Sequence, residues 1–362
     1  QIIFMSVAVF GQPNTEHKFT MLHEVKTTPV KSQGKTGTCW SFSTTSFLEN
    51  ELLRLGQAEL DISEMFTVRH KLIPMAEKYI RYHGTSNFGS GGQAHDALNV
   101  IRKYGLVPEE VYTGMNIGLD HHNQTEMSEV IKGMLDGVLN SKQKLTPNWK
   151  KSVEAVLDVY LGTPPQKFEY NGKNYTPKSF AKEIGIDTDN YIELTSYTHQ
   201  PFYEKFNLQL PDNWTNNEYY NVPINELIAI MDNSIKKGYS FVWDGDTGKD
   251  NFDKKECVAV IAEESLVEVE ELEIEKQISQ KDRQEAFESF DVTDDHLMNI
   301  VGVAENQKGT KFYYTKNSWG TKDKKYDGFW YMSEQYVRLK TVAILVHKEV
   351  IPSGIKEKLN IN

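Results

Sequence analysis

The stretch that decides the fold reads QGKTGTCWSF and occupies residues 33–42. Apolar residues recur at helical spacing over residues 41–55, so Cys39 is expected at the start of a helix. A cysteine attacks as the thiolate, and a helix N-terminus stabilises that negative charge. A lone cysteine before a helix is often only a small buried side chain, but the residues around Cys39 favour a nucleophile.

Gln33 and Gly37, which both precede Cys39, support this interpretation. Gln33 lies six residues earlier, on the loop that enters the helix. Its side-chain amide is placed to join the Cys39 backbone N–H group in an oxyanion hole. Gly37 has no side chain and leaves room for a substrate backbone to pass close by. We therefore expect Gln33 to act in catalysis and Gly37 in substrate binding.

A second group of candidate residues lies far downstream. His296 begins the apolar run HLMNIVGVA, and Asn317 follows in YYTKNSWG. Two neighbouring strands would bring these side chains together, so that Asn317 accepts a hydrogen bond from the imidazole and fixes its tautomer. Trp319 would then shield that hydrogen bond from water. His296 is expected to take the thiol proton and deliver it to the leaving amine.

The composition excludes several classes of protein. The chain of 362 residues has a net charge of −11, so it lacks the positively charged surface that is typical of a nucleic-acid binder. Two cysteines cannot form a disulfide framework, and Cys257 is expected to be a free strand cysteine. No stretch reaches the roughly 18 apolar residues of a membrane span. No histidine has zinc-enzyme spacing to carboxylates, and His121 and His122 lie in a polar stretch, so neither a metal nor another cofactor is predicted.

Hydrophobic periodicity changes along the chain and predicts an α+β fold. The first half favours helices and the second half favours strands, so two subdomains facing each other are expected. The segment 263–275 holds seven glutamates and is interpreted as a solvated helix or loop face, with an acidic docking surface as the alternative. The expected helices cover residues 41–55, from 63 onward, 93–104, 127–139, 149–161 and 224–237, and the expected strands cover 239–243, 257–261, 297–305, 311–317, 328–333 and 341–347.

At these motifs the chain resembles the papain-like cysteine peptidases. The resemblance implies a papain-like fold, in which the active-site cleft lies between a helical subdomain and a β-rich subdomain. It also implies that the Gly-Gly backbone pairs with the extended substrate like an added strand, so that Gly91 and Gly92, with Trp319, join Gly37 as substrate-binding residues. The matching residues are Gln33, Gly37, Cys39, Trp40, Ser63, Glu64, Gly91, Gly92, His296, Asn317, Ser318, Trp319, Gly320, Gly328, Phe329 and Trp330.

Within that superfamily the chain is most similar to the bleomycin hydrolase and bacterial aminopeptidase C branch. This similarity implies a peptidase core with helical insertions, peptide substrates and no long inhibitory pro-segment, and the family forms hexamers. The segments that carry it are YTPKSFAKEIGI at 175–186, SYTHQPFYEKFNLQLPDNW at 196–214, VPINELIAIMDNSIKKGYSFVWDGDTGK at 222–249 and DDHLMNIVGVA at 294–304.

The expected organisation is an N-terminal segment, 1–29, followed by a peptidase domain, 30–362. Ten residues without charge, Ile2 to Gly11, resemble a secretory signal peptide that has lost its basic leader, which would place the mature protein outside the cytoplasm. The alternative is a buried first strand or helix, and then a cytoplasmic protein. The domain divides into a nucleophile-bearing helical part at 30–114, a helical insertion region at 115–238, a β-rich part with His296 and Asn317 at 239–347 and a tail at 348–362.

Three features depart from the branch. The helical insertion region is shorter, and Gly89 stands where secreted papain relatives have a disulfide cysteine. The resemblance also implies a C-terminal arm whose terminal carboxylate meets the α-amino group of the substrate. Here the tail offers only Glu357 and the carboxylate of Asn362, which puts strict aminopeptidase behaviour and the hexamer in question.

Several functions therefore compete. A cysteine peptidase leads, with an aminopeptidase ahead of an endopeptidase. A non-catalytic peptide-binding relative is disfavoured because Gln33, Cys39, His296 and Asn317 are all present. An acyltransferase with a Cys-His-Asp site, such as a transglutaminase, is disfavoured because a carboxamide stands in the third position.

Overall fold

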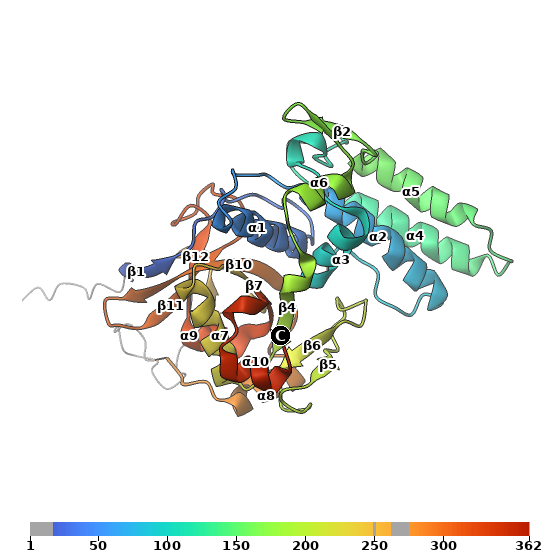
Figure 1. Ribbon diagram of the computed structural model, residues 1–362. Coiled ribbons are helices and arrows are strands. Elements are labelled where there is room, and N and C mark those ends of the chain that lie inside the picture. The colour runs from blue at the N-terminus through green and yellow to red at the C-terminus, as the bar shows by residue number, and fades with distance from the viewer. Residues whose placement is uncertain (1–16, 249–250, 262–274, 362) are drawn as a thin grey trace, which may run out of the picture.

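The computed structural model describes residues 17–248, 251–261 and 275–361. It has the expected α+β architecture, in which a layer of helices packs against one large sheet (Figure 1). The proposed signal segment from Ile2 to Gly11 and nearly all of the glutamate-rich segment 263–275 lie outside the described residues.

Helix α1 (Cys39–Arg54) is the central helix of the molecule, and its first fourteen residues are all buried. It packs against β10 on one side and against α2 and α3 on the other. Ser63 caps α2 by accepting a hydrogen bond from the Phe66 N–H group at 3.1 Å, and Gly105 ends α3 with a φ of 89°. The other helices are α2 (Glu64–Arg81), α3 (Ala94–Tyr104), α4 (Thr125–Asn140), α5 (Asn148–Leu161), α6 (Pro177–Glu183), α7 (Ile224–Lys236), α8 (Gln280–Glu288), α9 (Glu334–Lys340) and α10 (Ser353–Leu359), with short 3₁₀ turns η1 (Glu109–Val111), η2 (Thr188–Asn190) and η3 (Lys348–Val350).

The large sheet is built around the long strand β10, which pairs with β7, β11 and β1. All three pairings are antiparallel. The strand that begins with His296 is therefore hydrogen-bonded to neighbours along both of its edges. Across the sheet the order is β5 (Lys205–Asn207), β6 (Glu218–Asn221), β4 (Tyr191–Thr195), β13 (Thr341–His347), β7 (Phe241–Gly245), β10 (His296–Asn306), β11 (Lys311–Lys316), β12 (Phe329–Ser333), β9 (Val258–Ala259) and β8 (Phe252–Asp253); β1 (Phe19–Glu24) joins β10 off this path, and β2 (Phe168–Tyr170) with β3 (Lys173–Tyr175) forms a separate hairpin.

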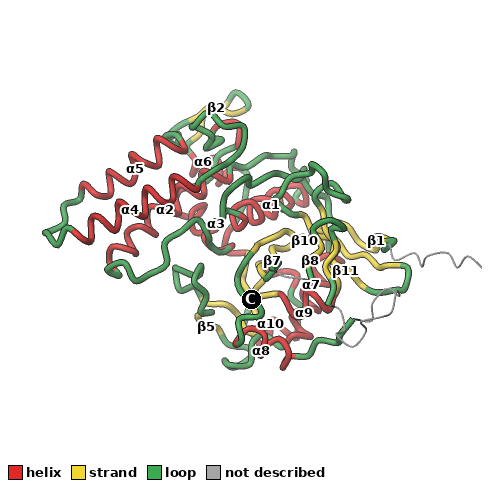
Figure 2. The backbone as a smooth tube through the Cα atoms, turned by 180° about the vertical axis from the view of Figure 1, so that it is seen from behind, coloured by secondary structure: helices red, strands yellow, loops and turns green. Residues whose placement is uncertain are grey.

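The two faces of the sheet bury different helices. Val242 and Leu297 belong to the core shared with α1, whereas Trp243 and Met298 belong to the core shared with α7. This alternation is the period of a strand buried on both faces. Helices α7, α9 and α10 therefore lie on the side of the sheet away from α1 (Figures 1 and 2). The side chains on the other face of β7 and β10, such as Val242 and Leu297, pack towards α1, the helix that begins at Cys39.

Two secondary-structure expectations were wrong in detail. Residues 115–238 were expected to be helical or irregular, yet β4, β5 and β6 lie there and extend the main sheet. These strands are only three to five residues long and leave little local pattern, and they join the sheet because β4 pairs with the distant β13. Cys257 is free and buried as expected, but it adopts a φ of 54° in the turn before β9.

Candidate active site

The structure brings His296 and Asn317 together. His296 is the first residue of β10 and Asn317 follows the last residue of the neighbouring β11. His296 Nε2 lies 2.8 Å from Asn317 Oδ1, and both residues are buried. The same oxygen accepts a hydrogen bond from the Ser318 N–H group at 2.7 Å. Asn317 is thus held by its own backbone turn while it holds the imidazole.

This hydrogen bond defines which nitrogen of His296 can act as a base. An amide oxygen only accepts, so Nε2 carries the hydrogen and Nδ1 keeps its lone pair. The Trp319 ring lies beside the imidazole, with centroids 4.8 Å apart and planes inclined by 32°. Burial lowers the pKa of His296, while the bond to Asn317 works in the opposite direction. The hydrogen bond therefore orients the ring, and burial favours its neutral form.

Cys39 begins α1 and is 8% exposed. Its sulfur interacts with the backbone N–H groups of Trp40 and of Leu297, the residue that follows His296 in β10. Burial raises the pKa of the thiol to about 12, and the nearby carboxyl groups of Asp294 and Asp244 act in the same direction. The resting thiol is protonated, so a thiolate forms only when the proton moves to a base.

Gln33 forms hydrogen bonds with both sequence motifs, the segment before Cys39 and the NSWG segment. Its side-chain amide donates to Thr36 O at 2.7 Å, and its oxygen accepts a hydrogen bond from Ser318 Oγ at 2.6 Å. The Gln33 backbone N–H group also donates to Ser318 O at 2.8 Å. The hydroxyl of Ser318 therefore fixes which way the Gln33 amide points. Sequence reasoning quoted Ser318 only as part of a motif and did not assign it this role.

The predicted glycines are crowded by protein atoms. A side chain on Gly37 would collide with Ser90 Oγ, and one on Gly91 would collide with the carboxylate of Asp212. A side chain on Gly92 would come within 3.1 Å of the Trp40 indole. The absence of a side chain at Gly91 thus allows a loop between β5 and β6 to lie directly against the Gly-Gly segment, which the sequence did not indicate.

One cluster in the described residues has the spacing of a metal site. Carboxylate oxygens of Glu49, Asp61 and Glu64 lie within 4.8 Å of one another. However, Lys31 Nζ contacts Asp61 and lies 2.9 Å from Glu49 and 2.7 Å from Glu64. The lysine ammonium already supplies the positive charge. The cluster ties the segment before Gln33 to α1 and α2.

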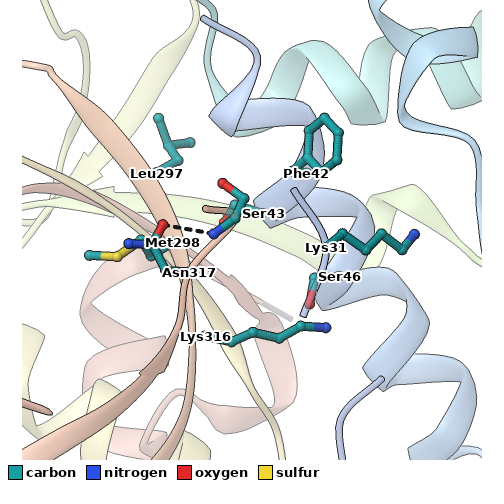
Figure 3. A pocket seen from close by; sticks show the side chains of 9 residues that line it. Lys31, Phe42, Ser43, Ser46, Leu297, Met298, Lys316 and Asn317 are labelled. Atoms are coloured by element: carbon teal, nitrogen blue, oxygen red, sulfur yellow. Dashed lines mark hydrogen bonds between the residues drawn. The ribbon is translucent and has the colours of Figure 1, made fainter. Parts of the chain in front are cut away.

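A small pocket of about 10 Å³ lies behind Asn317, between α1 and the strands (Figure 3). A cavity of this size has room for at most one water molecule. Lys316 Nζ donates to Thr28 Oγ1 at 2.8 Å, and burial lowers the pKa of Lys316 to about 8. The pocket is too small for a peptide. It is lined by Lys31, Phe42, Ser43, Ser46, Leu297, Met298, Lys316, Asn317 and Ser318.

A cysteine at a helix start, facing a strand that begins with a histidine held by an asparagine, is the arrangement of the papain-like cysteine peptidases. The chain belongs to the peptidase C1-like family, whose profile matches residues 67–362. The resemblance inferred from the sequence is therefore confirmed. The matched range contains His296 and Asn317 but begins after Gln33 and Cys39.

The relatives come from bacteria. Aminopeptidase G of Lactobacillus delbrueckii subsp. lactis is 24% identical, over 93% of this chain and 85% of its own length. Aminopeptidase C of Listeria monocytogenes is 23% identical, over 93% of this chain and 84% of its own. The crystal structure of PepW from Lactobacillus rhamnosis HN001 aligns with a TM-score of 0.76 and 17% identity, covering 94% of this chain and 84% of that one. The PepW alignment supports the fold.

Within the described part of the chain, no helix combines the length and apolar character that crossing a bilayer would require.

Proposed function

We propose that this cysteine peptidase uses Cys39 as its nucleophile and His296 as its general base, and that it acts as an aminopeptidase. His296 Nδ1 takes the thiol proton as the sulfur attacks the carbonyl carbon of the scissile bond. The imidazolium then protonates the leaving amine, and water hydrolyses the resulting thioester. Asn317 orients the imidazole throughout and exchanges no proton.

The 2.8 Å hydrogen bond between His296 and Asn317 carries this proposal. It leaves Nδ1 as the free basic nitrogen of the buried ring. Transfer of the proton converts two uncharged groups into an ion pair, which is more favourable in a buried site than a single charge. The high pKa of the isolated Cys39 thiol is compatible with this mechanism because the imidazolium stabilises the thiolate.

Gln33 is proposed as an oxyanion-hole donor together with the Cys39 N–H group. Within the described residues, the Gln33 amide donates one hydrogen bond, to Thr36 O. An amide nitrogen carries two hydrogens, so one remains for a substrate oxygen. Gly37, Gly91, Gly92 and Trp319 are proposed to border the bound peptide.

The aminopeptidase assignment rests on the names of the relatives, because the described tail does not provide an N-terminal anchor. Ile355 and Leu359 of α10 are buried in the core shared with α7, and Lys358 Nζ lies 2.6 Å from Glu226. The described tail is therefore on the face of the sheet opposite Cys39. A preference for free N-termini would require another acidic group, and a papain-like endopeptidase is the second candidate.

The deciding experiment compares hydrolysis of alanyl p-nitroanilide with that of N-acetyl-alanyl p-nitroanilide, by the wild type and by Cys39→Ala. An aminopeptidase cleaves the free amine much faster, and the variant cleaves neither. Equal rates on both substrates would replace the aminopeptidase by an endopeptidase.

Three further hypotheses concern the domain, the N-terminal segment and the oligomeric state. The peptidase domain at 30–362 should resist limited proteolysis as one unit. If the segment from Ile2 to Gly11 is part of a signal peptide, the full precursor expressed in bacteria should be processed and exported. A hexamer, as in the family, should be visible by analytical ultracentrifugation, and a monomer there would exclude it.

A further inference from the structure

A buried carboxyl group whose side chain hydrogen-bonds to another carboxyl group, that of Asp294, lies next to the proposed nucleophile. Asp244 stands opposite Leu297 in the pairing of β7 with β10, and by strand alternation it shares the α1-facing side with Val242. It is 3% exposed, and neither of its oxygens accepts a hydrogen bond from an N–H or O–H group of the described residues. Such a group is expensive to bury, so its presence requires an explanation.

Asp294 connects this carboxyl group to the Gly91–Gly92 segment. It lies two residues before His296, and its carboxyl group adjoins that of Asp244. Gln93, which directly follows Gly92, donates from Nε2 to Asp294 Oδ2 at 2.7 Å. Asp294 is partly exposed whereas Asp244 is buried behind it. The pair thus begins at the solvent edge and extends inwards.

The surroundings of the pair are rich in acidic groups, although the buried Arg283 guanidinium lies over the Tyr197 ring. Burial raises the pKa of both carboxyl groups, that of Asp294 to about 7, and Asp212 raises both further. The buried hydroxyl of Tyr197, whose pKa is raised by burial and further by the two aspartates, also lacks a hydrogen-bond partner among the described residues. Beside the bond between the two carboxyl groups, the Asp244 oxygens and the Tyr197 hydroxyl therefore keep acceptor positions that no N–H or O–H group of the described residues fills. An ammonium group offers three N–H donors and a positive charge.

We propose that Asp244 and Asp294 form the receptor for a substrate ammonium group on the acyl side of the scissile bond. The proposal rests on the proposed function, since it takes Cys39 as the nucleophile. The ammonium group can be the substrate's N-terminus or the side chain of a lysine. In either case the recognising chemistry is the same pair of carboxyl groups.

The location of the pair supports the acyl side. Both carboxyl groups act electrostatically on the Cys39 thiol, and Gln93 links Asp294 to the Gly91–Gly92 segment. The loop between β5 and β6 closes the same region, because the Asp212 carboxylate lies against Gly91. Trp214 of this loop is anchored by a 3.0 Å hydrogen bond to Asp96. A peptide whose acyl part ends beside Asp294 would place its ammonium group among these carboxyl groups.

The test compares four substrates with Asp244→Asn, Asp294→Asn and a control, Asp189→Asn. The substrates are alanyl p-nitroanilide, its N-acetyl derivative, and the p-nitroanilides of N-acetyl-lysyl-alanine and N-acetyl-norleucyl-alanine. Asp189 has a side chain that is 81% exposed and pairs with Arg102 on the surface, so its variant changes the net charge equally without touching the pair. Circular dichroism establishes that each variant is folded.

We expect kcat/KM for the preferred ammonium-bearing substrate to fall about 10- to 100-fold in both pair variants, as for a lost hydrogen bond to a charged group. Any change in the reactivity of Cys39 affects the uncharged substrates equally, so the ratio of kcat/KM between the preferred charged substrate and its uncharged counterpart should fall by about this factor, and Asp189→Asn should match the wild type throughout. Loss confined to alanyl p-nitroanilide identifies the N-terminus as the source, and loss confined to the lysyl substrate identifies the side chain. Equal losses on charged and uncharged substrates, or an unchanged preference, would overturn the proposal.

A binding measurement separates this proposal from the proposed function. Calorimetric titration of alanine amide and N-acetyl-alanine amide into Cys39→Ala, with and without Asp244→Asn, needs no turnover. Tighter binding of the free amine that disappears with Asp244→Asn supports the receptor even if the wild type hydrolyses none of the substrates. Identical binding of both amides to Cys39→Ala, together with identical binding of N-acetyl-lysyl-alanine amide and N-acetyl-norleucyl-alanine amide, would contradict it.

Discussion

Ser318 donates its hydroxyl hydrogen to Gln33 Oε1 at 2.6 Å, across 285 positions of sequence. This bond joins the loop before Cys39 to the turn after Asn317. It therefore aligns the proposed oxyanion donor with the base that is held by the neighbouring residue. Gln33 is buried, so its amide has no solvent to replace a lost partner.

Gln33→Ala should lower kcat about 10²- to 10³-fold with little change in KM, because an oxyanion donor acts in the transition state. Ser318→Ala should lower kcat by a smaller factor, about 5-fold, since one neutral hydrogen bond is lost and the donor stays in place. Steady-state kinetics on one substrate measures both. A change limited to KM in Gln33→Ala would show that Gln33 only binds the ground state.

Asn317→Ala should leave a weak but measurable enzyme, well above Cys39→Ala. The pH profile gives a sharper test. The pKa of His296 is lowered from 6.5 by burial, so the acid limb of kcat/KM should have its midpoint below pH 6.5. The hydrogen bond to Asn317 raises that pKa, so removing it should move the acid limb to still lower pH. An unshifted limb with full activity would mean that another group holds His296.

Asp244→Asn should increase thermal stability at pH 8 but not at pH 4. The folded state raises the pKa of Asp244 well above 3.8, so it binds a proton that the unfolded chain releases. Wild-type stability therefore falls as the pH rises above about 4 towards the folded pKa, and the asparagine removes this loss. We expect the Tm difference to grow with pH, to about 1–3 °C. A Tm lowered equally at both pH values would indicate a structural role for the carboxyl group.

Lys31→Met should destabilise the fold by about 3–5 kcal/mol at pH 8, because buried carboxylates lose their counterion. Three carboxylates contact Lys31, and the side chains of Glu49 and Glu64 are 0% and 3% exposed. Without the ammonium group the pKa of Glu64, already raised to about 7, should rise further. The deficit should therefore shrink as the pH falls below about 7.

Urea unfolding at pH 5 and pH 8 measures this difference. Lys281→Met serves as the control, because the Lys281 side chain is 82% exposed and forms a surface pair with Glu285. The control should stay within about 0.5 kcal/mol of the wild type. A pH-independent deficit in Lys31→Met would mean that lost packing, rather than charge, is responsible.

Features with a local signal were predictable from the sequence. The serine cap at Ser63 and Gly105 marked helix boundaries that the structure reproduces within one residue. The strand beginning at His296 and the NSWG motif placed two residues on adjacent strands, and the observed hydrogen bond matches. These signals succeed because capping, periodicity and turn chemistry are carried by neighbours in sequence.

Features made by distant contacts were not predictable. Nothing near Asp212 indicates that it lies against Gly91, and nothing near Asp244 indicates that Asp294 adjoins it. Each contact joins segments whose relative position depends on the register of a whole sheet. The proposed recognition site therefore became visible only with the fold, whereas Cys39 could be proposed as the nucleophile from its neighbours in sequence.

The two cysteines allow the most direct test of the central claim, that Cys39 is the nucleophile. Cys39→Ala and Cys257→Ala are compared for hydrolysis of alanyl p-nitroanilide and its N-acetyl derivative, with the fold checked by circular dichroism. Cys257 is fully buried in the core shared with α7, whereas Cys39 belongs to the core shared with α1, so Cys257→Ala should retain turnover while Cys39→Ala loses it on both substrates. Ordinary turnover by a folded Cys39→Ala protein would contradict the account.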